Sequence, residues 1–195
     1  MTEVRTDAGT VDYAYNGAGN RVATTAGGST TRQLYDLATD DGSPELLADG
    51  STSYVQGPAG VVAEETGSTA TYPLVDAVGS VRSVTDASGA VVGTTAYDPF
   101  GVVRSQTGTV SRFGYGGGLA DGGRVHLGAR DLDTATGRFL SVDPLRPGGP
   151  GSVGWNPYAY GANNPTTYTD PTASTKGYVA VLPVSSATTP AGPCT

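Results

Sequence analysis

Several residue types that globular enzymes commonly use are scarce in this chain. Cys, Met, Trp and His occur once each, and Phe occurs three times. Cys194 has no second cysteine with which to form an internal disulfide, so cysteine content gives no information about the redox compartment. No apolar run is long enough to cross a membrane, and residues 1–5 lack the apolar stretch of a signal peptide. We therefore expect no membrane span and no signal peptide in this chain.

Charge is also sparse, and it is scattered along the sequence. The chain carries 18 acidic and 11 basic residues, which gives a formal net charge of −7 at pH 7. The basic residues do not cluster, so the cationic surface that a phosphate backbone requires is lacking. We expect no nucleic-acid partner.

Glycine, proline and tyrosine are abundant instead. The chain has 30 Gly, 13 Pro and 11 Tyr, and the apolar spacing of an amphipathic helix is nearly absent. Tyr, Val and Thr suit a pleated surface, whereas Gly and Pro interrupt it. Short runs of this kind predict strands at residues 11–15, 53–55, 61–63, 80–84 and 90–92. The predicted fold class is all-β.

The turns between these runs share one form, Asp/Asn/Gly-x-x-Gly. It occurs at residues 16–19, 57–60, 76–79, 86–89 and 98–101. An Asp or Asn in the first position can accept hydrogen bonds from the backbone that follows it, and Gly in the fourth position tolerates a positive φ. Each unit is therefore interpreted as a hairpin. Units of roughly 20 residues that cannot bury a face alone predict a repeat array in which neighbours supply each other's core.

The pattern divides the chain into three segments. Residues 1–96 are expected to be degenerate hairpin repeats, and residues 97–173 form a unique segment in which the repetition stops. Within the unique segment, Gly114 to Gly118 form a glycine-rich junction, in which Gly116-Gly117-Gly118 are expected to be flexible. Residues 174–195 are rich in Thr, Ser, Ala and Pro, and we expect a short, poorly ordered tail. Its 22 residues are too few for an enzymatic domain.

Four motifs in the unique segment occur in an order that resembles the repeat-associated core domain of RHS/YD-repeat proteins. They are Tyr97-Asp98-Pro99-Phe100-Gly101, the stretch from Ala129 to Pro144, the stretch from Asn156 to Pro165, and Asp170-Pro171-Thr172-Ala173. The second stretch ends in Gly-Arg-Phe-Leu-Ser-Val-Asp-Pro, and the third contains Tyr-Gly-Ala-Asn-Asn-Pro. Tyr-Asp and Tyr-Asn pairs upstream extend the resemblance to most of residues 11–173.

Proteins of this family, which include the C component of insecticidal Tc toxins and bacterial polymorphic toxins, build a hollow β-shell that spirals around a cargo. Their core segment curls inward as a plug. The resemblance implies that this chain is the C-terminal shell and plug segment of a toxin-encapsulating protein that is secreted or displayed at the cell surface. Its implied partners are a C-terminal toxin or peptide cargo and the rest of an RHS shell. In many members the core also cuts the chain just after the Asp-Pro-x-Gly motif, as an aspartic protease.

The resemblance places three residues at such an aspartic site. Asp143 matches the Asp of Ser-x-Asp-Pro, Arg130 matches the Arg of Arg-Tyr-Tyr, and Asp170 of the last motif is the expected second carboxylate. Aspartic proteolysis needs two carboxyl groups that share a proton, so that one activates water while the other protonates the amide. A guanidinium beside them would orient a carboxylate by bidentate bonding. The expected cleavage region comprises Ala173, Ser174 and Thr175.

Departures from the family pattern argue against efficient cleavage. Asp131-Leu132 stands where the family has Tyr-Tyr, which removes two aromatic side chains that would pack the plug and adds a charge. Ala173 replaces the motif Gly, and a β-carbon is costly wherever φ must be positive. Ser174 stands where an apolar residue commonly precedes the cut. We therefore expect self-cleavage to be slow or lost, and the chain to act mainly as a structural element.

Other interpretations stay open at this point. Asp-Pro is a common turn opener, as at Asp98-Pro99, so spacing alone does not make Asp143 or Asp170 catalytic. His126 has no Ser or Cys partner motif and is interpreted as a strand residue. Asp131-x-Asp133 lacks the later ligands of a calcium loop, and we expect neither a metal nor a cofactor.

Two other functional classes also remain. Extended hairpin arrays serve cell-surface recognition as well, so a binding or adhesion module is the first alternative. The second is a truncated remnant without independent activity, because Met1 begins in mid-repeat and a few hairpins cannot close a shell.

Overall fold

The protein is represented by a computed structural model that describes residues 3–6, 9–17, 20–36, 44–57, 60–143, 156–170 and 179–180. In these residues the regular structure is β-strand apart from two short 3₁₀ helices, η1 (Tyr115–Gly117) and η2 (Tyr160–Asn163), which agrees with the all-β prediction. The strands are β1 (Glu3–Thr6), β2 (Gly9–Tyr15), β3 (Arg21–Ala26), β4 (Ser29–Asp36), β5 (Glu45–Asp49), β6 (Thr52–Gly57), β7 (Gly60–Thr66), β8 (Thr69–Val75), β9 (Val81–Thr85), β10 (Val91–Tyr97), β11 (Val103–Gly108), β12 (Leu119–Asp121), β13 (Arg124–Leu127), β14 (Arg130–Asp133), β15 (Arg138–Phe139), β16 (Tyr168–Thr169) and β17 (Val179–Ala180).

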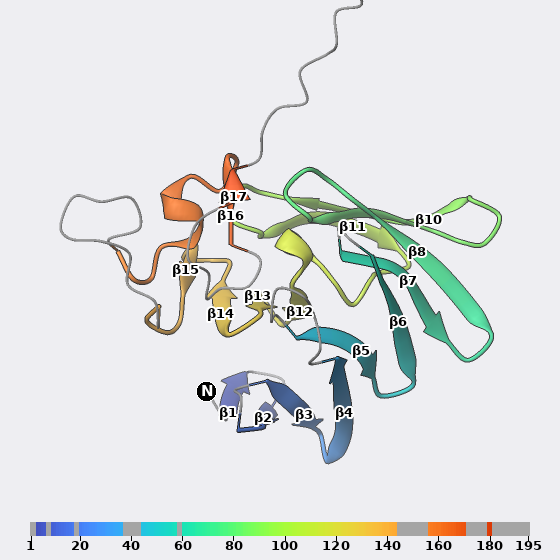
Figure 1. Cartoon of the computed structure of the whole chain (residues 1–195), viewed down its shortest axis with the longest axis horizontal. Coiled ribbons are helices and arrows are strands. Elements are labelled where there is room, and N and C mark those ends of the chain that lie inside the picture. The colour runs from blue at the N-terminus through green and yellow to red at the C-terminus, as the bar shows by residue number, and fades with distance from the viewer. Residues whose placement is uncertain are drawn as a thin grey trace, which may run out of the picture.

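The strands are arranged as antiparallel meanders. Strands β1 to β11 form one 11-stranded sheet whose spatial order is the order of the chain, and we call this sheet the wall. Strands β12 to β15 form a separate four-stranded sheet, the core sheet, and β16 pairs with β17. Figure 1 shows the wall curving around the region that holds β12, β13 and η1. The predicted hairpin array is therefore confirmed as a single continuous sheet.

The three predicted Asp-x-x-Gly turns that lie wholly within the described residues, which we call the Asx–Gly turns, have the geometry that the sequence predicts. The predicted turns at 16–19 and 57–60 include residues outside the described ones. Asp76 Oδ1 accepts hydrogen bonds from the backbone N–H groups of Val78 and Ser80, at 3.1 and 2.9 Å. Gly79 follows with φ of +82°, a conformation that a β-carbon disfavours. The turns at 86–89 and 98–101 repeat this arrangement. Local side-chain capping thus reverses the chain at each of these points.

Interruptions in strand pairing recur along the wall at intervals close to the predicted repeat length. The pairing register shifts at Ala14/Tyr15, Leu34/Tyr35, Val55/Gln56, Leu74/Val75 and Ala96/Tyr97. A bulge bends the strand that carries it and increases local twist. Bulges that recur in this way give the wall a persistent curvature.

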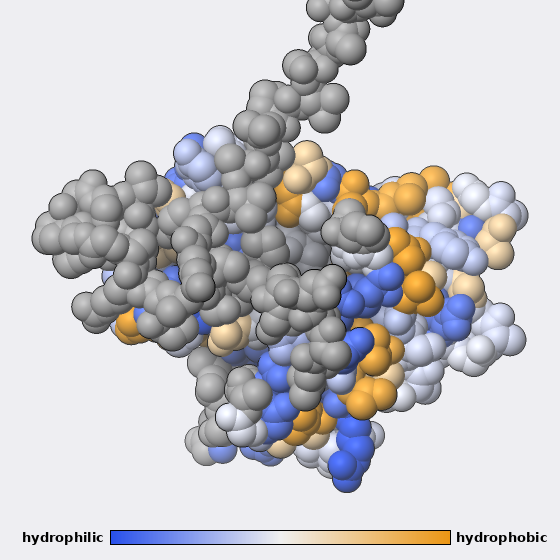
Figure 2. Space-filling model, in the orientation of Figure 1, coloured by the Kyte–Doolittle hydropathy of each residue, from blue (hydrophilic) through white to orange (hydrophobic). Residues whose placement is uncertain are grey.

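One face of the wall is buried and the other is exposed. In β6, Tyr54 is buried while its neighbour Val55 is 47% exposed, as expected for side chains that alternate between faces. The core on the buried face consists of Leu46, Tyr54, Val61, Val81, Val84, Phe113 and Leu119. On the molecular surface drawn in Figure 2, apolar residues form separate patches between hydrophilic ones.

The segment that follows β11 runs across the buried face of the wall. Phe113 meets the ring of Tyr54 edge-on, with centroids 5.0 Å apart. The backbone N–H of Val81 in β9 donates to the carbonyl of Gly114 at 3.1 Å. Because these contacts reach both β6 and β9, the segment is fixed against the wall over several strands.

The glycine-rich junction is packed, so the expectation that it is flexible is wrong. Gly116 and Gly118 are both buried. A β-carbon on Gly118 would lie against Val125 and 2.7 Å from a methyl group of Leu127. Glycine is therefore required at this position because the junction passes close to strand β13, and chain mobility is not the reason.

A second apolar cluster joins the core sheet to η1 and η2. Its buried members are Tyr115, Val125, Leu127, Leu132, Phe139 and Tyr160. Tyr160 is 1% exposed, and its ring centroid lies 5.7 Å from that of Tyr115 and 5.8 Å from that of Phe139. Aromatic contacts thus join η1, η2 and β15 into one unit.

The predicted segment boundary at residues 96 and 97 falls at the end of β10. The wall continues past it, because β11 pairs with β10 over Val103–Gly108. The three predicted segments stay a prediction. Of the predicted tail, only Val179 and Ala180 are among the described residues.

Candidate functional site

Three residues that the sequence assigned to an aspartic site lie together. Arg130 begins β14, Asp143 lies a few residues after β15, and Asp170 directly follows β16. The Nη2 atom of Arg130 lies 2.9 Å from Oδ2 of Asp143 and 2.9 Å from Oδ2 of Asp170. The two carboxylate oxygens are therefore no farther apart than twice that distance. The family resemblance groups these residues in one hypothesis, and the fold brings their side chains together.

The Arg130 guanidinium is held on several sides. Its carbon lies 3.7 Å from the centroid of the Phe139 ring, and its Nη1 atom donates to the carbonyl of Pro157 at 3.2 Å. The same carbonyl accepts a hydrogen bond from the backbone N–H of Asp143 at 3.0 Å. Pro157 thus ties the arginine and the first carboxylate to a common anchor.

Asp170 is positioned by an unusual turn. Residues 161–163 all have positive φ, at 51°, 53° and 62°, although the last two are Ala and Asn. The turn is tied to β16, because the carbonyl of Asn164 accepts the backbone N–H of Tyr168 at 2.9 Å. Consecutive left-handed residues are costly and persist where surrounding contacts enforce them. Here they direct the chain so that Asp170, 3% exposed, meets Arg130.

The burial and the charges of these three side chains determine which chemistry they can support. The side chains of Arg130, Asp143 and Asp170 are 2%, 14% and 4% exposed. Two carboxylates around one guanidinium carry a net negative charge. A carboxylate and a carboxylic acid side by side are the acid–base pair of aspartic proteolysis. The same buried ion cluster also joins β14 to the ends of β15 and β16.

The expected cleavage region, Ala173, Ser174 and Thr175, lies outside the described residues. The chain on either side of it is paired in antiparallel fashion. Thr169 is opposite Val179, and Tyr168 is opposite Ala180. The expected cut therefore falls in the connection between β16 and β17, close in sequence to Asp170.

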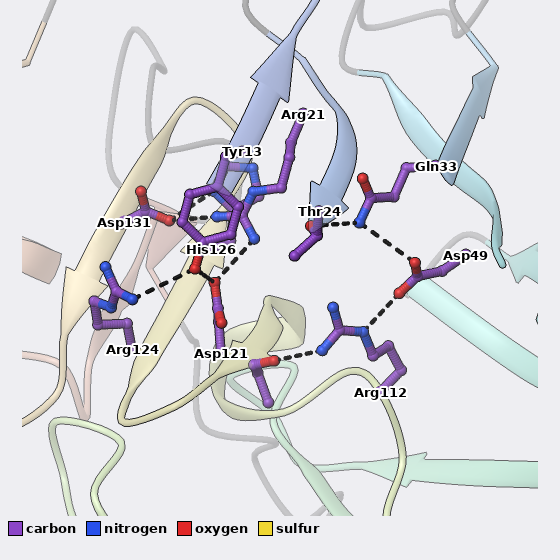
Figure 3. A network of polar contacts seen from close by, with 11 residues as sticks. Tyr13, Arg21, Thr24, Gln33, Asp49, Arg112, Asp121, Arg124, His126 and Asp131 are labelled. Carbon is purple, nitrogen blue, oxygen red and sulfur yellow. Dashed lines mark hydrogen bonds and ion pairs between the residues drawn. The ribbon is translucent and has the colours of Figure 1, made fainter. Parts of the chain in front are cut away.

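A second polar network connects the wall to the core sheet, and sequence reasoning did not find it (Figure 3). Arg21, the first residue of β3, is 1% exposed. Its Nη1 atom lies 3.0 Å from Oδ2 of Asp121, and its Nη2 atom lies 3.1 Å from Oδ1 of Asp131. Its guanidinium carbon also stacks 4.1 Å above the centre of the Tyr13 ring. No local pattern distinguishes this arginine from Arg82 in β9, whose side chain is 42% exposed.

The sequence predicts that the charge of Asp131 disturbs the packing of the plug. In the structure, this charge is paired with both His126 and Arg21. His126 Nδ1 lies 2.8 Å from the same Oδ1 atom that meets Arg21. Burial alone would raise the pKa of Asp131, but His126 and Arg21 outweigh burial and hold this pKa below its ordinary value. His126 lies in β13, as the sequence predicted. Burial and the hydrogen bond to Asp121 raise the pKa of Tyr13 to about 12.

Further polar contacts join the wall to the segment that crosses it. Arg112 Nε lies 2.7 Å from Oδ2 of Asp49 in β5, as Figure 3 also shows. Ser111 donates its hydroxyl to the buried carboxylate of Glu64 in β7 at 2.6 Å. These contacts lie away from Arg130 and fix the crossing segment, whereas the Arg21 network reaches β14 directly.

A cavity of about 360 Å³ lies beside two Asx–Gly turns and includes Asp76, Asp98 and Tyr115 in its lining. Arg130, Asp143 and Asp170 do not line it, so it is separate from the candidate site.

Among the described residues, no group of three or more His, Cys, Asp or Glu side chains is arranged to hold a metal ion. In the same residues, no helix combines the length and the apolar character needed to cross a membrane.

Sequence comparisons identify long relatives. The family model described as Teneurin YD-shell matches residues 52–148. The tRNA3(Ser)-specific nuclease WapA of Bacillus spizizenii is 34% identical over 169 residues, which are 82% of this chain and 7% of that protein. The tRNA nuclease WapA of Bacillus subtilis is 32% identical over the same shares. This chain thus spans only a small part of each of these relatives.

Solved structures show the same fold. The crystal structure of TcdB2-TccC3-Cdc42 matches 85% of this chain and 9% of that chain, with a TM-score of 0.63 and 23% identity. The Tc holotoxin pore of Photorhabdus luminescens matches 88% of this chain and 9% of that chain, with a TM-score of 0.60 and 20% identity. At these identities the likeness concerns the fold alone. The match to the Teneurin YD-shell model and the 34% identity to WapA over 82% of this chain show that the chain belongs to the RHS/YD-repeat family.

Proposed function

We propose that this chain is a wall-and-plug segment of a larger RHS shell that encloses a C-terminal cargo. The observation that carries the proposal is the docking of the crossing segment and the core sheet against the buried face of a curved repeat sheet (Figure 1). The long relatives support a larger assembly, because this chain corresponds to 7% of their length. Location outside the cell, by secretion or display at the cell surface, is part of the same proposal.

The pairing of the wall strands supports continuation of the wall. Within the described residues, β11 pairs only with β10, so this end of the sheet has an edge without a strand partner. Exposed strand edges invite pairing with another strand. In a shell, further hairpins would cover such an edge, and the persistent curvature from the bulges would direct them around an interior.

Encapsulation is tested with an epitope tag added after Thr195 and with particles purified from native cells. We expect the tag to resist proteinase K in intact particles and to be digested once the particles are unfolded. A tag digested at the same rate in both states would refute encapsulation. Attachment of the purified protein to cells or glycans without any protected C-terminal peptide would instead support the adhesion alternative.

The convergence of Arg130, Asp143 and Asp170 favours a second function, aspartic self-cleavage near Ser174. One carboxylate accepts a proton from water while the water oxygen adds to the carbonyl carbon of the peptide bond. The protonated carboxyl group then donates its proton to the leaving nitrogen, and the C–N bond breaks. The products are a new carboxyl group at Ser174 and a new amine at Thr175. Arg130 would orient the ionised carboxylate during this cycle.

We propose that cleavage in the native sequence is slow because Ala173 replaces the motif glycine. Intact mass spectrometry over hours compares the wild type, Ala173→Gly, and Ala173→Gly combined with Asp143→Asn. We expect Ala173→Gly to release a C-terminal peptide that begins near Thr175, and the added Asp143→Asn change to abolish this release. Unchanged masses in all three chains would leave the buried cluster with a structural role only.

A further inference from the structure

We propose that Arg21 in the wall is a positioning residue for the Arg130–Asp143–Asp170 cluster, so that self-cleavage requires the β2–β3 hairpin to be docked on strand β14. This inference rests on the self-cleavage proposed above. It adds a regulatory condition: the cut occurs only after the wall has closed on the core sheet.

Strand β14 carries both contacts on consecutive residues. Arg130 contacts Asp143 and Asp170, whereas the next residue, Asp131, contacts Arg21. Successive side chains of a strand point to opposite faces, so a single short strand lies between the wall hairpin and the carboxylate cluster. A shift of β14 at one face therefore moves the guanidinium of Arg130 at the other.

Asp131 also holds the segment that presents Asp143. The backbone N–H of Leu140 donates to the carbonyl of Asp131 at 2.9 Å. From Leu140 the chain reaches Asp143 after two intervening residues. The anchor of the wall hairpin on Asp131 therefore controls the position of Asp143 in addition to that of Arg130.

Arg21 is buried in this contact, and its removal would take away the cation that Asp121 and Asp131 share. Its side chain is 1% exposed, and the carboxylates of Asp121 and Asp131 that it joins are 20% and 12% exposed. Without the guanidinium, two partly buried carboxylates would face each other across the space that it occupies. Removal of one partner of a buried ion pair is strongly unfavourable, so the hairpin and β14 are expected to move apart.

A movement of β14 would change the rate of cleavage, because catalysis depends on the exact placement of the reacting groups. A misplacement of about 1 Å at reacting groups can lower a rate about 100-fold. The hairpin precedes the core sheet by most of the wall, because β3 begins at Arg21 and β14 begins at Arg130. The β2–β3 hairpin contacts β14 only when the intervening repeats have folded around the core sheet. Contact between Arg21 and Asp131 therefore requires a folded wall.

The experiment uses the full chain in the Ala173→Gly background and measures the rate of peptide release by intact mass spectrometry. We expect Arg21→Gln to slow release at least 10-fold while the far-UV circular dichroism stays that of a folded β protein. Arg21→Lys, which keeps the cation, is expected to recover part of the rate. Arg112→Gln is the matched control, because it breaks another ion pair between the wall and the chain that crosses it, and it is expected to cleave like the parent.

The single histidine supplies a spectroscopic check that does not depend on cleavage. The ring resonances of His126 are expected to change in Arg21→Gln and to stay unchanged in Arg112→Gln, since only the former alters the network around Asp131. If Arg21→Gln unfolds, the isosteric Asp131→Asn takes its place and is expected to slow release several-fold.

The possible outcomes separate the two proposals. An Ala173→Gly parent that stays intact would overturn self-cleavage and the positioning role together. A parent that cleaves, with folded Arg21→Gln and Asp131→Asn variants that cleave equally fast, would overturn the positioning role alone. Equal slowing by Arg112→Gln would also overturn it, because the effect would then reflect general loosening of the wall.

Discussion

Substitution of Gly118 by alanine tests whether the glycine-rich junction is packed. Gly118 has φ of −82° and ψ of 161°, which alanine adopts freely, so backbone strain contributes nothing to the expected effect. The added β-carbon would lie against Val125, 2.7 Å from Leu127 Cδ2 and 2.9 Å from the carbonyl oxygen of His126. Because one of these atoms belongs to the backbone of β13, side-chain rotation alone cannot relieve the overlap.

We expect Gly118→Ala to lower the free energy of unfolding by about 3 kcal/mol, at the upper end of the usual cost of overpacking. For a chain of this size, that loss corresponds to a fall of roughly 6–12 °C in the melting temperature. Urea and thermal unfolding followed by far-UV circular dichroism measure both quantities. Gly17→Ala is the control, since a β-carbon added there would have no atom within 4 Å. Equal stability of the two variants would refute the packed junction.

Further predictions concern the core, the buried network and the turns. Leu132→Ala removes a side chain that is 0% exposed and is expected to cost about 2–5 kcal/mol in urea unfolding, whereas Leu34→Ala, at a position that is 61% exposed, should cost less than about 1 kcal/mol. The pKa of Asp131 is lowered in the folded state, so its stabilisation is present above the unfolded-state value of about 3.9 and is lost as pH falls through the lower folded value. The stability difference between wild type and Asp131→Asn should therefore be full near neutral pH and shrink in strong acid, and a constant difference would contradict this assignment. Asp98→Ala removes two turn hydrogen bonds and should cost about 1–2 kcal/mol by thermal unfolding, while Asp98→Asn, which retains an acceptor, should cost less.

Local features of the fold were predictable from the sequence. The turn at 76–79 needs only an acceptor at Asp76 and a residue that tolerates positive φ at Gly79, and both lie within four consecutive residues. The strands between such turns follow from short β-forming runs. The repeat length was also predictable, because successive hairpins use the same local turn chemistry.

The candidate site was predictable only through the order of its motifs. Arg130, Asp143 and Asp170 lie within one stretch of unique sequence, and family resemblance named them together. Their proximity depends on the turn at 161–163, whose positive φ values fall on Ala and Asn as well as Gly, and no composition rule indicates that. Their catalytic roles stay a prediction.

Long-range packing was not predictable in this way. Arg21 and Asp131 meet across most of the chain, and each is polar, so neither carried the apolar signal of a core position. Gly116 and Gly118 were interpreted as flexible because glycine frees the backbone, although in this fold Gly118 permits close approach of β13 and Gly116 permits close approach of Tyr160. Both errors arise because burial is decided by tertiary contacts that single-sequence patterns do not encode.

Electron cryomicroscopy of the particles that contain this chain in native cells can show whether the chain forms part of a closed shell. We expect a closed shell in which strands β2 to β11 form part of the wall, with the core sheet and Asp170 on the interior side. A map in which the core sheet lies on the outer surface, or in which the repeats form an open stalk without an interior, would contradict it.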